Sequence, residues 1–190
     1  MAGVRLHAHA KQMKEQLIAT HGIQDLAPFM VVLTDDNVTA FGHCGPEMEE
    51  ALGNGVRMGD ILTTSIATLR ARHNDIPLKR MMFVVEGYSR GFSVEAQSMK
   101  EAREQAEAIA HGDLAKDYAD NPDSDVCEVL MTNIWNYEHG RIQFQLWVSP
   151  FHYTDGGVIV WGEDVGPLGD DAQGEGVEGA IAEAGKAVMR

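Results

Sequence analysis

Residues 126–148, VCEVLMTNIWNYEHGRIQFQLWV, decide the fold of this chain. Two runs rich in β-branched and aromatic residues, 126–137 and 141–148, flank the turn-forming triplet Glu138-His139-Gly140. In the second run apolar residues alternate with polar ones, which is the period of a strand with one buried face. The stretch therefore predicts a long β-hairpin with one face packed on a core.

Other segments extend this sheet. A strand over 158–161 follows the turn Asp155-Gly156-Gly157. Near the start of the chain, 29–34 and 38–41 flank the turn residues Asp35-Asp36-Asn37 and predict a second hairpin. Residues 79–88 are almost continuously apolar, as in a central strand that is covered on both faces.

Helices are predicted between these strands. Residues 4–21 place an apolar series on one helical face, with Gly22 at the usual C-terminal position: Leu6, Ala10, Met13 and Leu17. Pro46 and the acids after it begin a second helix that ends before Pro77, either continuous or broken at Gly53-Asn54-Gly55. A capping box at Ser98 begins a third helix, to about residue 111, and the polar residues 113–125 predict a linker.

The predicted order is α-β-β-α-β-α-β-β-β, which favours an α+β domain over 1–161 with helices packed on a mostly antiparallel sheet. Residues 162–190 differ, because seven of these 29 residues are glycine and seven are acidic. We interpret them as an arm ending in a short amphipathic helix, which docks on a partner or on its own domain. The apolar face of that helix comprises Val177, Ile181, Ala184 and Val188.

Charge is distributed unevenly along the chain. Residues 1–92 carry 9 Lys and Arg against 10 Asp and Glu, and residues 93–190 carry 6 against 19, which gives the net charge of -14. This balance disfavours binding to nucleic acid, which requires clustered cations. It is typical of an interaction segment, or of an acidic inhibitor that mimics nucleic acid.

The composition also bounds the compartment. Two cysteines, Cys44 and Cys127, do not make a disulfide framework, and the N-terminal residues lack the apolar core of a signal peptide. No apolar run approaches the length that crosses a bilayer. We expect a protein of the cytoplasm, or of a particle assembled there, with no membrane partner.

One motif suggests an enzyme. Gly87-Tyr88-Ser89-Arg90-Gly91 matches the G-x-S-x-G nucleophile elbow and follows a predicted strand. In a serine hydrolase built on Ser89, His139 or His152 would be the base, and Asp125 a candidate orienting acid. Against this, the residues after the motif look extended, whereas an elbow leads directly into a helix.

Metal and cofactor signals are weak, and we predict neither. His7 and His9 are two apart on a helix and point to nearly opposite sides. Glu86, at the end of an apolar strand, is the acid most expected to be buried or functional. Trp135, Trp147 and Trp161 lie one per C-terminal strand, which suits core packing or an aromatic surface for a protein partner. Of these, Trp147 and Trp161 are the candidate partner-binding residues.

Two stretches carry a resemblance. FVVEGY at 83–88 and NPDSDVCEVL at 121–130 resemble two strands of small uncharacterised proteins common in phage and bacterial genomes. The resemblance spans about residues 61–148, departs at Gly87, and implies no activity or site residues. It implies a phage or prophage origin. Together these observations favour a non-enzymatic interaction or assembly protein that binds a protein partner or copies of itself, with the Ser89 hydrolase as the alternative.

Overall fold

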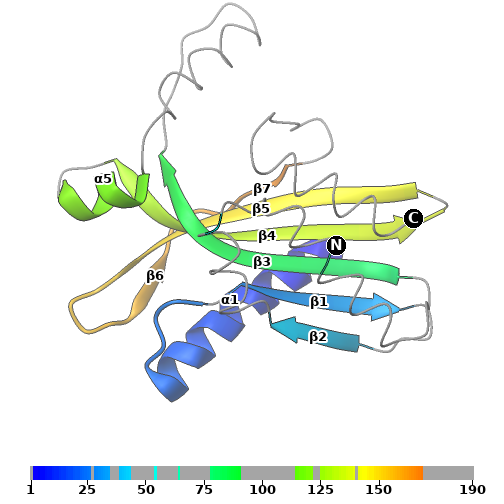
Figure 1. The fold of residues 1–190 in the computed structure, drawn as a ribbon, viewed down its shortest axis with the longest axis horizontal. Coiled ribbons are helices and arrows are strands. Elements are labelled where there is room, and N and C mark those ends of the chain that lie inside the picture. Colours follow the sequence, from blue (N-terminus) through cyan, green and yellow to red (C-terminus); the bar gives the residue numbers. More distant parts are fainter. Residues whose placement is uncertain are drawn as a thin grey trace, which may run out of the picture. The chain divides into compact units, whose positions relative to one another are not determined.

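The computed structural model describes residues 2–26, 28–34, 39–43, 54, 64, 78–90, 114–121, 125–139 and 141–168. Within them the chain forms a seven-stranded sheet in the order β2-β1-β3-β4-β5-β6, with β7 also paired to β5 (Figure 1). The sheet is antiparallel and is combined with helices, so the predicted α+β class is confirmed.

The N-terminal hairpin is confirmed. β1 (Phe29–Thr34) pairs antiparallel with β2 (Thr39–His43) on one side and with β3 (Leu78–Arg90) on the other. Five successive residues of β3, from Met81 to Val85, are buried, which only a strand covered on both faces allows. The central position predicted for this apolar run is therefore correct.

The long hairpin that decides the fold is also confirmed. β4 (Val126–Glu138) and β5 (Arg141–Tyr153) are neighbours in the sheet, and residues 139 and 140 connect them. His139 takes a φ of +52°, the left-handed conformation that short hairpin connections require. Phe144 and Leu146 are buried, as the alternating pattern predicts, and Phe144 contacts the fully buried ring of Trp135.

Two short strands follow β5. The predicted β6 (Ile159–Trp161) pairs antiparallel with Phe151–Tyr153. The next strand, β7 (Val165–Leu168), pairs with β5 through Val148 and Leu146 and was not predicted. Residues 165–168 fall within the arm expected from residue 162, so an element of the sheet extends past the expected domain boundary at 161. Residues 169–190, with the predicted terminal helix, lie outside the described residues.

Helix α1 (Ala2–His21) ends as predicted. Gly22 has a φ of +66° and its N–H bonds the Ile18 carbonyl at 2.9 Å, which is the glycine cap expected at this position. A correction concerns the polar stretch before β4, where α5 (Leu114–Asp120) replaces part of the expected linker. The helices predicted after Pro46 and Ser98 lie outside the described residues, except that Asn54 lies in a turn and Thr64 in a helix.

The chain divides into two compact units. The first contains residues 1–86, 131–148 and 164–190, and the second contains residues 87–130 and 149–163. The first holds α1, β1, β2, β7 and most of the buried core, and the second holds α5 and β6. No helix among the described residues has the length and apolar character to cross a membrane.

Candidate functional site

The buried side of α1 differs from the side that its apolar residues predict. His7, Ala10 and Lys14 are the buried positions, at steps of three and four, whereas Leu6 and Met13 are only half-buried. The helix is therefore rotated by about one residue from the expected face. The reason is that two polar side chains of α1, His7 and Lys14, form hydrogen bonds with residues of the sheet. All of these residues belong to the first unit.

Lys14 is the most deeply buried of these polar residues. Its ammonium group donates to the Gln24 carbonyl oxygen at 2.7 Å and to the Glu86 carboxylate on β3. Only 1% of the Lys14 side chain is exposed, and the Glu86 side chain is mostly buried. Burial raises the pKa of Glu86, and the hydrogen bond and charge of Lys14 oppose that rise. The expectation that Glu86 is a buried acid holds, and its partner is a residue that the sequence did not single out.

His7 is held between β4 and β5. Its Nδ1 and the Thr132 Oγ1 are 2.9 Å apart and hydrogen-bonded, and both residues are buried. The ring stacks on Trp147 with centroids 5.3 Å apart and planes at 17°. Burial lowers the pKa of His7, although the nearby Asp164 opposes the shift. The ring is therefore predominantly neutral at pH 7.

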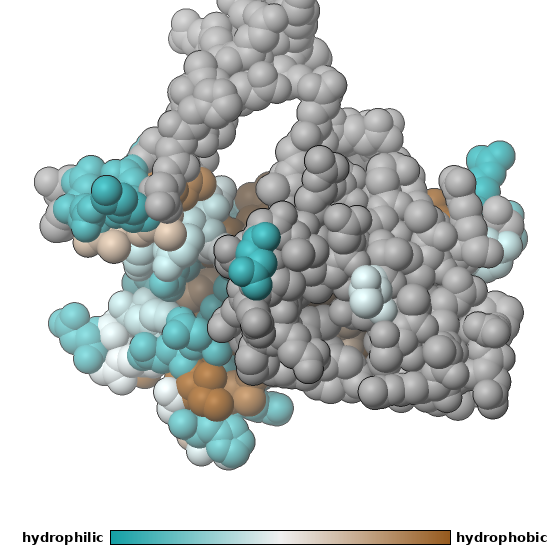
Figure 2. All heavy atoms as spheres, viewed as in Figure 1, coloured by the Kyte–Doolittle hydropathy of each residue, from teal (hydrophilic) through white to brown (hydrophobic). Residues whose placement is uncertain are grey.

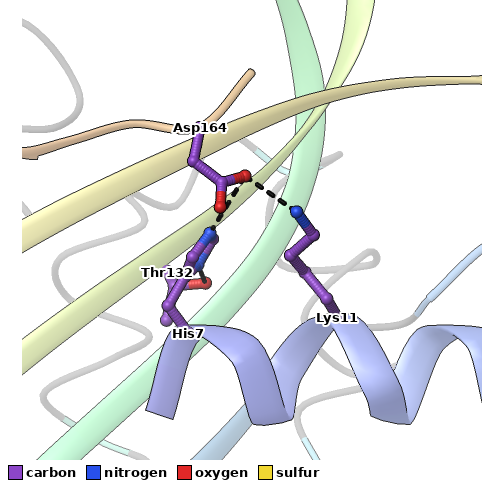
Figure 3. A network of polar contacts seen from close by, with 4 residues as sticks. All are labelled: His7, Lys11, Thr132 and Asp164. Carbon is purple, nitrogen blue, oxygen red and sulfur yellow. Dashed lines mark hydrogen bonds and ion pairs between the residues drawn. The ribbon is translucent and has the colours of Figure 1, made fainter. Parts of the chain in front are cut away.

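Asp164 closes this polar network from the other side. Figure 3 shows the His7 and Lys11 side chains of α1 pointing to the same Asp164 carboxylate. The Lys11 Nζ lies 2.8 Å from Asp164 Oδ1, and the His7 Nε2 lies 3.6 Å from that oxygen. Asp164 immediately precedes β7, so these contacts join α1 to the start of the last described strand.

The network binds elements together and is poorly placed for catalysis. The order Thr132–His7–Asp164 matches the connectivity of a catalytic triad, but Thr132 is fully buried and only 2% of His7 is exposed. A hydroxyl without access to solvent cannot attack a substrate. We assign His7, Lys11, Thr132 and Asp164 a structural role, in which α1 is fixed to β4 and β7.

The hydrolase candidates do not form an elbow. Ser89 lies inside β3, which continues as a strand to Arg90, so the serine does not occupy the strained strand-to-helix turn that the mechanism needs. Its carbonyl oxygen accepts a weak hydrogen bond from the Cys127 thiol at 3.5 Å. His139 is the hairpin turn residue of the first unit, while His152 and Asp125 are exposed residues of the second.

The two histidines considered as metal ligands, His7 and His9, do not lie on the same side of α1. His7 is buried and His9 exposed, so they face opposite sides of α1 as the spacing predicted. Among the described residues, no three His, Cys, Asp or Glu side chains gather as metal ligands would. Cys127 is half-buried on β4, and Cys44 lies outside the described residues.

The tryptophans divide by role. Trp135 is a core residue, and Trp147 forms the stack on His7 with its Nε1 buried. Trp161 packs edge-to-face on Phe151 at 5.5 Å in the second unit and is half-buried. Of the predicted partner-binding residues, Trp147 thus has a packing role, and Val177, Ile181, Ala184 and Val188 lie outside the described residues.

Sequence reasoning missed two exposed groups in the second unit. The first is the β5–β6 hairpin, where Val158 is 63% and Val160 39% exposed. The second is a pair of tyrosines, Tyr88 on β3 and Tyr118 on α5, whose ring centroids are 5.2 Å apart. In the first unit, Figure 2 shows apolar atoms at the surface near the C-terminal end of α1, where Ile23 is exposed.

Comparison of the chain with sequence profiles of protein families, with curated proteins and with solved structures finds no match. The geometry of its own residues is therefore the basis for a functional proposal.

Proposed function

We propose that this chain is a non-enzymatic assembly protein that associates with copies of itself through the β5–β6 hairpin. The observation that carries the proposal is the exposure of Val160 within β6 and of Val158 just before it, since β6 is the last strand of the described sheet order. An exposed apolar edge strand is a template for pairing with another chain. His7, Lys14 and Thr132 of the first unit are buried in contacts that hold α1 on the sheet, which supports a binding role rather than catalysis.

The hairpin is well defined, as a docking element must be. The Thr154 N–H bonds the Val158 carbonyl at 2.9 Å, and the Thr154 hydroxyl accepts from the Val158 N–H at 3.2 Å. At its base, the Phe151 ring contacts both Tyr153 and Trp161. The hairpin therefore loses little conformational freedom when a second chain binds.

The sequence of β6 lacks the usual protection of an edge. Ile159, Val160 and Trp161 include no charge and no proline, which are the devices by which exposed edges avoid pairing. An antiparallel pair of two β6 strands centred on Val160 would place Ile159 opposite Trp161 of the other copy. That register opposes β-branched and aromatic side chains, which pair favourably, and sets Glu163 opposite Gly157 rather than another acid.

Charge sets the conditions for this association. Each chain carries a net charge of -14, so two copies repel each other at low ionic strength. Salt screens the repulsion without weakening apolar contact. We therefore expect the fraction of associated chains to increase with salt concentration.

The test is the native mass from light scattering across a range of protein and salt concentrations. Val160→Lys places a charge in the paired edge and is expected to lower the mass to that of one chain. Val4→Lys is the matched control, because Val4 is also exposed but lies on α1. A wild-type chain that is monomeric throughout, or a Val160→Lys variant with the wild-type mass, would contradict the proposal.

The predicted arm is a second contact in the same proposal. We expect residues 169–190 to join paired copies into larger assemblies, so a chain ending at Leu168 should have the mass of the pair. An unchanged mass would contradict a connecting role for the arm. The phage origin implied by the resemblance at 83–88 and 121–130 fits a virion or accessory component and stays a prediction.

A further inference from the structure

The β5–β6 hairpin of the second unit has two faces that differ in exposure. Successive side chains of a strand point to opposite faces, so Ile159 and Trp161 share one face and Val158 and Val160 share the other. Ile159 and Trp161 are half-buried. Val160 is 39% exposed, and Val158, which is bonded to Thr154 across the hairpin, is 63% exposed. One face of the hairpin therefore presents two valines to solvent.

Pairing of two copies enlarges this apolar face. In the antiparallel register centred on Val160, Val158 of one copy lies opposite Gly162 of the other, which adds no side chain to the face. The two valines of one copy then continue into the two valines of the other. The outer members, Val158 of each copy, are separated by four residue steps along the strand and by one strand spacing, which is about 14 Å. Within a single hairpin, Val158 and Val160 span only about 7 Å.

The predicted C-terminal helix has an apolar face of matching length. Its apolar residues recur at steps of four, three and four: Val177, Ile181, Ala184 and Val188. At 1.5 Å per residue this face is about 16 Å long. It therefore matches the four valines of a pair, and it is more than twice as long as the two valines of one hairpin. An isolated helix of this length is marginal in water, so the apolar face requires a surface on which to pack.

We propose that the valine row, which comprises Val158 and Val160 of two paired copies, is the docking surface for residues 177–188 from a neighbouring pair. The inference rests on the pairing proposed above and specifies the contact through which the arm joins one pair to the next. Residues 169–176, three of which are glycine, precede the helix. They can span up to about 27 Å, which gives the helix the reach to bind a separate pair.

Symmetry explains how such a contact produces larger assemblies. The valine row lies across the two-fold axis of the pair, so each pair has one row, whereas it carries two arms. When one helix occupies a row, the second arm of that pair remains available for the row of another pair. Contacts between an arm and a row are therefore heterologous, and they extend the assembly instead of closing it.

Light scattering of full-length variants tests the docking surface. Val158→Ser lowers the apolar character of the row but leaves β6 itself unchanged, and Ile181→Ser does the same to the centre of the helix face. We expect both variants to have the mass of a pair at protein concentrations where the wild type is larger. Ala182→Ser is the matched control, because residue 182 lies off the apolar face, and it should keep the wild-type mass.

The masses distinguish failure of the docking surface from failure of the pairing. A wild type that stops at the mass of a pair would overturn the docking surface and leave the pairing intact, whereas a wild type of single-chain mass would overturn both. A Val158→Ser variant with the wild-type mass would also overturn the docking surface, since the arm would then bind elsewhere. A Val158→Ser variant of single-chain mass would overturn it too, because Val158 would then belong to the pairing contact.

Discussion

The Lys14 ammonium group on α1 is enclosed between the Glu86 carboxylate on β3 and the Gln24 carbonyl oxygen, and 1% of its side chain is exposed. A helix thus carries a full positive charge into its contact with a sheet. Such a burial is tolerated only where the charge is paired and hydrogen-bonded, because the desolvation penalty is otherwise several kcal/mol. The pair consequently fixes the rotation of α1 about its own axis, which apolar packing alone would have set differently.

The first prediction concerns the loss of this pair. Lys14→Met keeps the aliphatic stem but leaves Glu86 buried without its cation, and we expect a loss of about 3–5 kcal/mol of unfolding free energy. Lys11→Met is the matched control on the same helix. Because Lys11 pairs with the partly exposed Asp164, its loss should cost about 1 kcal/mol or less. Urea denaturation followed by circular dichroism measures both.

The double variant Lys14→Met/Glu86→Gln identifies the cause. It removes both charges, and we expect it to be more stable than Lys14→Met alone because no uncompensated carboxylate remains. If the two substitutions instead cost the sum of their separate effects, Lys14 and Glu86 would not be coupled. The burial of the Lys14 stem would then explain the whole effect.

The second prediction is a pH dependence that originates at His7. Burial lowers the pKa of His7 in the folded chain, so between the folded and unfolded pKa values the unfolded chain binds more protons. The contribution of His7 to stability is therefore present above pH 6.5, its unfolded pKa, and is lost as the pH falls through the lower folded value. Melting temperatures measured from neutral to mildly acidic pH should show this loss in the wild type.

Substitutions of the two neighbouring histidines isolate that slope. His7→Gln should lower stability at pH 7, because it removes the stack on Trp147, and should flatten the decline of melting temperature toward acid pH. His9→Gln, at an exposed position of the same helix, should leave the decline as it is. A His7→Gln variant with the wild-type pH profile would assign the acid sensitivity to other groups.

The β-strands could be predicted from the sequence because their signals are local. Alternation, β-branched residues and turn triplets located both hairpins and defined β4 to within one residue, whereas β5 continues to Tyr153, five residues past its predicted end at Val148. The rotation of α1 could not be predicted in the same way, since an apolar stripe through Leu6 and Met13 is the stronger pattern. Lys14 can be buried because Glu86, a residue distant in sequence, pairs with its charge. The sequence indicated this pair only through the expectation that Glu86 is a buried acid.

The remaining misses have a related physical cause. Residues 165–168 contain glycine and proline and show no strand pattern, so β7 exists because β5 offers it a pairing edge and α1 holds Asp164. The short α5 likewise has no buried residue and no periodicity to reveal it. Segments whose structure depends on contacts with distant residues are the ones that local patterns do not identify.

The third prediction tests how closely β7 fits β5. Between Val148 and Leu146, two steps along β5 face three steps along β7, and Gly166 accommodates the extra residue at a φ of +141°. A Cβ there would lie 2.8 Å from the Leu146 carbonyl oxygen and 3.2 Å from the Trp147 ring. Gly166→Ala should therefore destabilise the chain through both strain and collision.

Gly22→Ala is the control for that effect. Gly22 also has a positive φ, but a Cβ at Gly22 meets no atom within 4 Å. We expect it to cost about 1 kcal/mol from backbone strain alone, and Gly166→Ala to cost more. Equal losses in thermal melts would show that the contact of β7 with Leu146 and Trp147 is loose.

The fourth prediction is that residues 162–168 belong to the folded domain, beyond the boundary expected at Trp161. A chain ending at Leu168 keeps β7 and the Asp164 contacts with Lys11 and His7, and we expect it to melt at a higher temperature than a chain ending at Trp161. A chain ending at Trp161 loses all of these, which leaves the β5 edge at Leu146 and Val148 without its strand and should lower the free energy of unfolding by about 2 kcal/mol or more. Asp164→Asn in the full chain separates the two contributions, because it removes the ion pair with Lys11 but keeps β7. If both truncated chains melted alike, β7 and Asp164 would contribute nothing measurable, and the boundary at residue 161 expected from composition would stand.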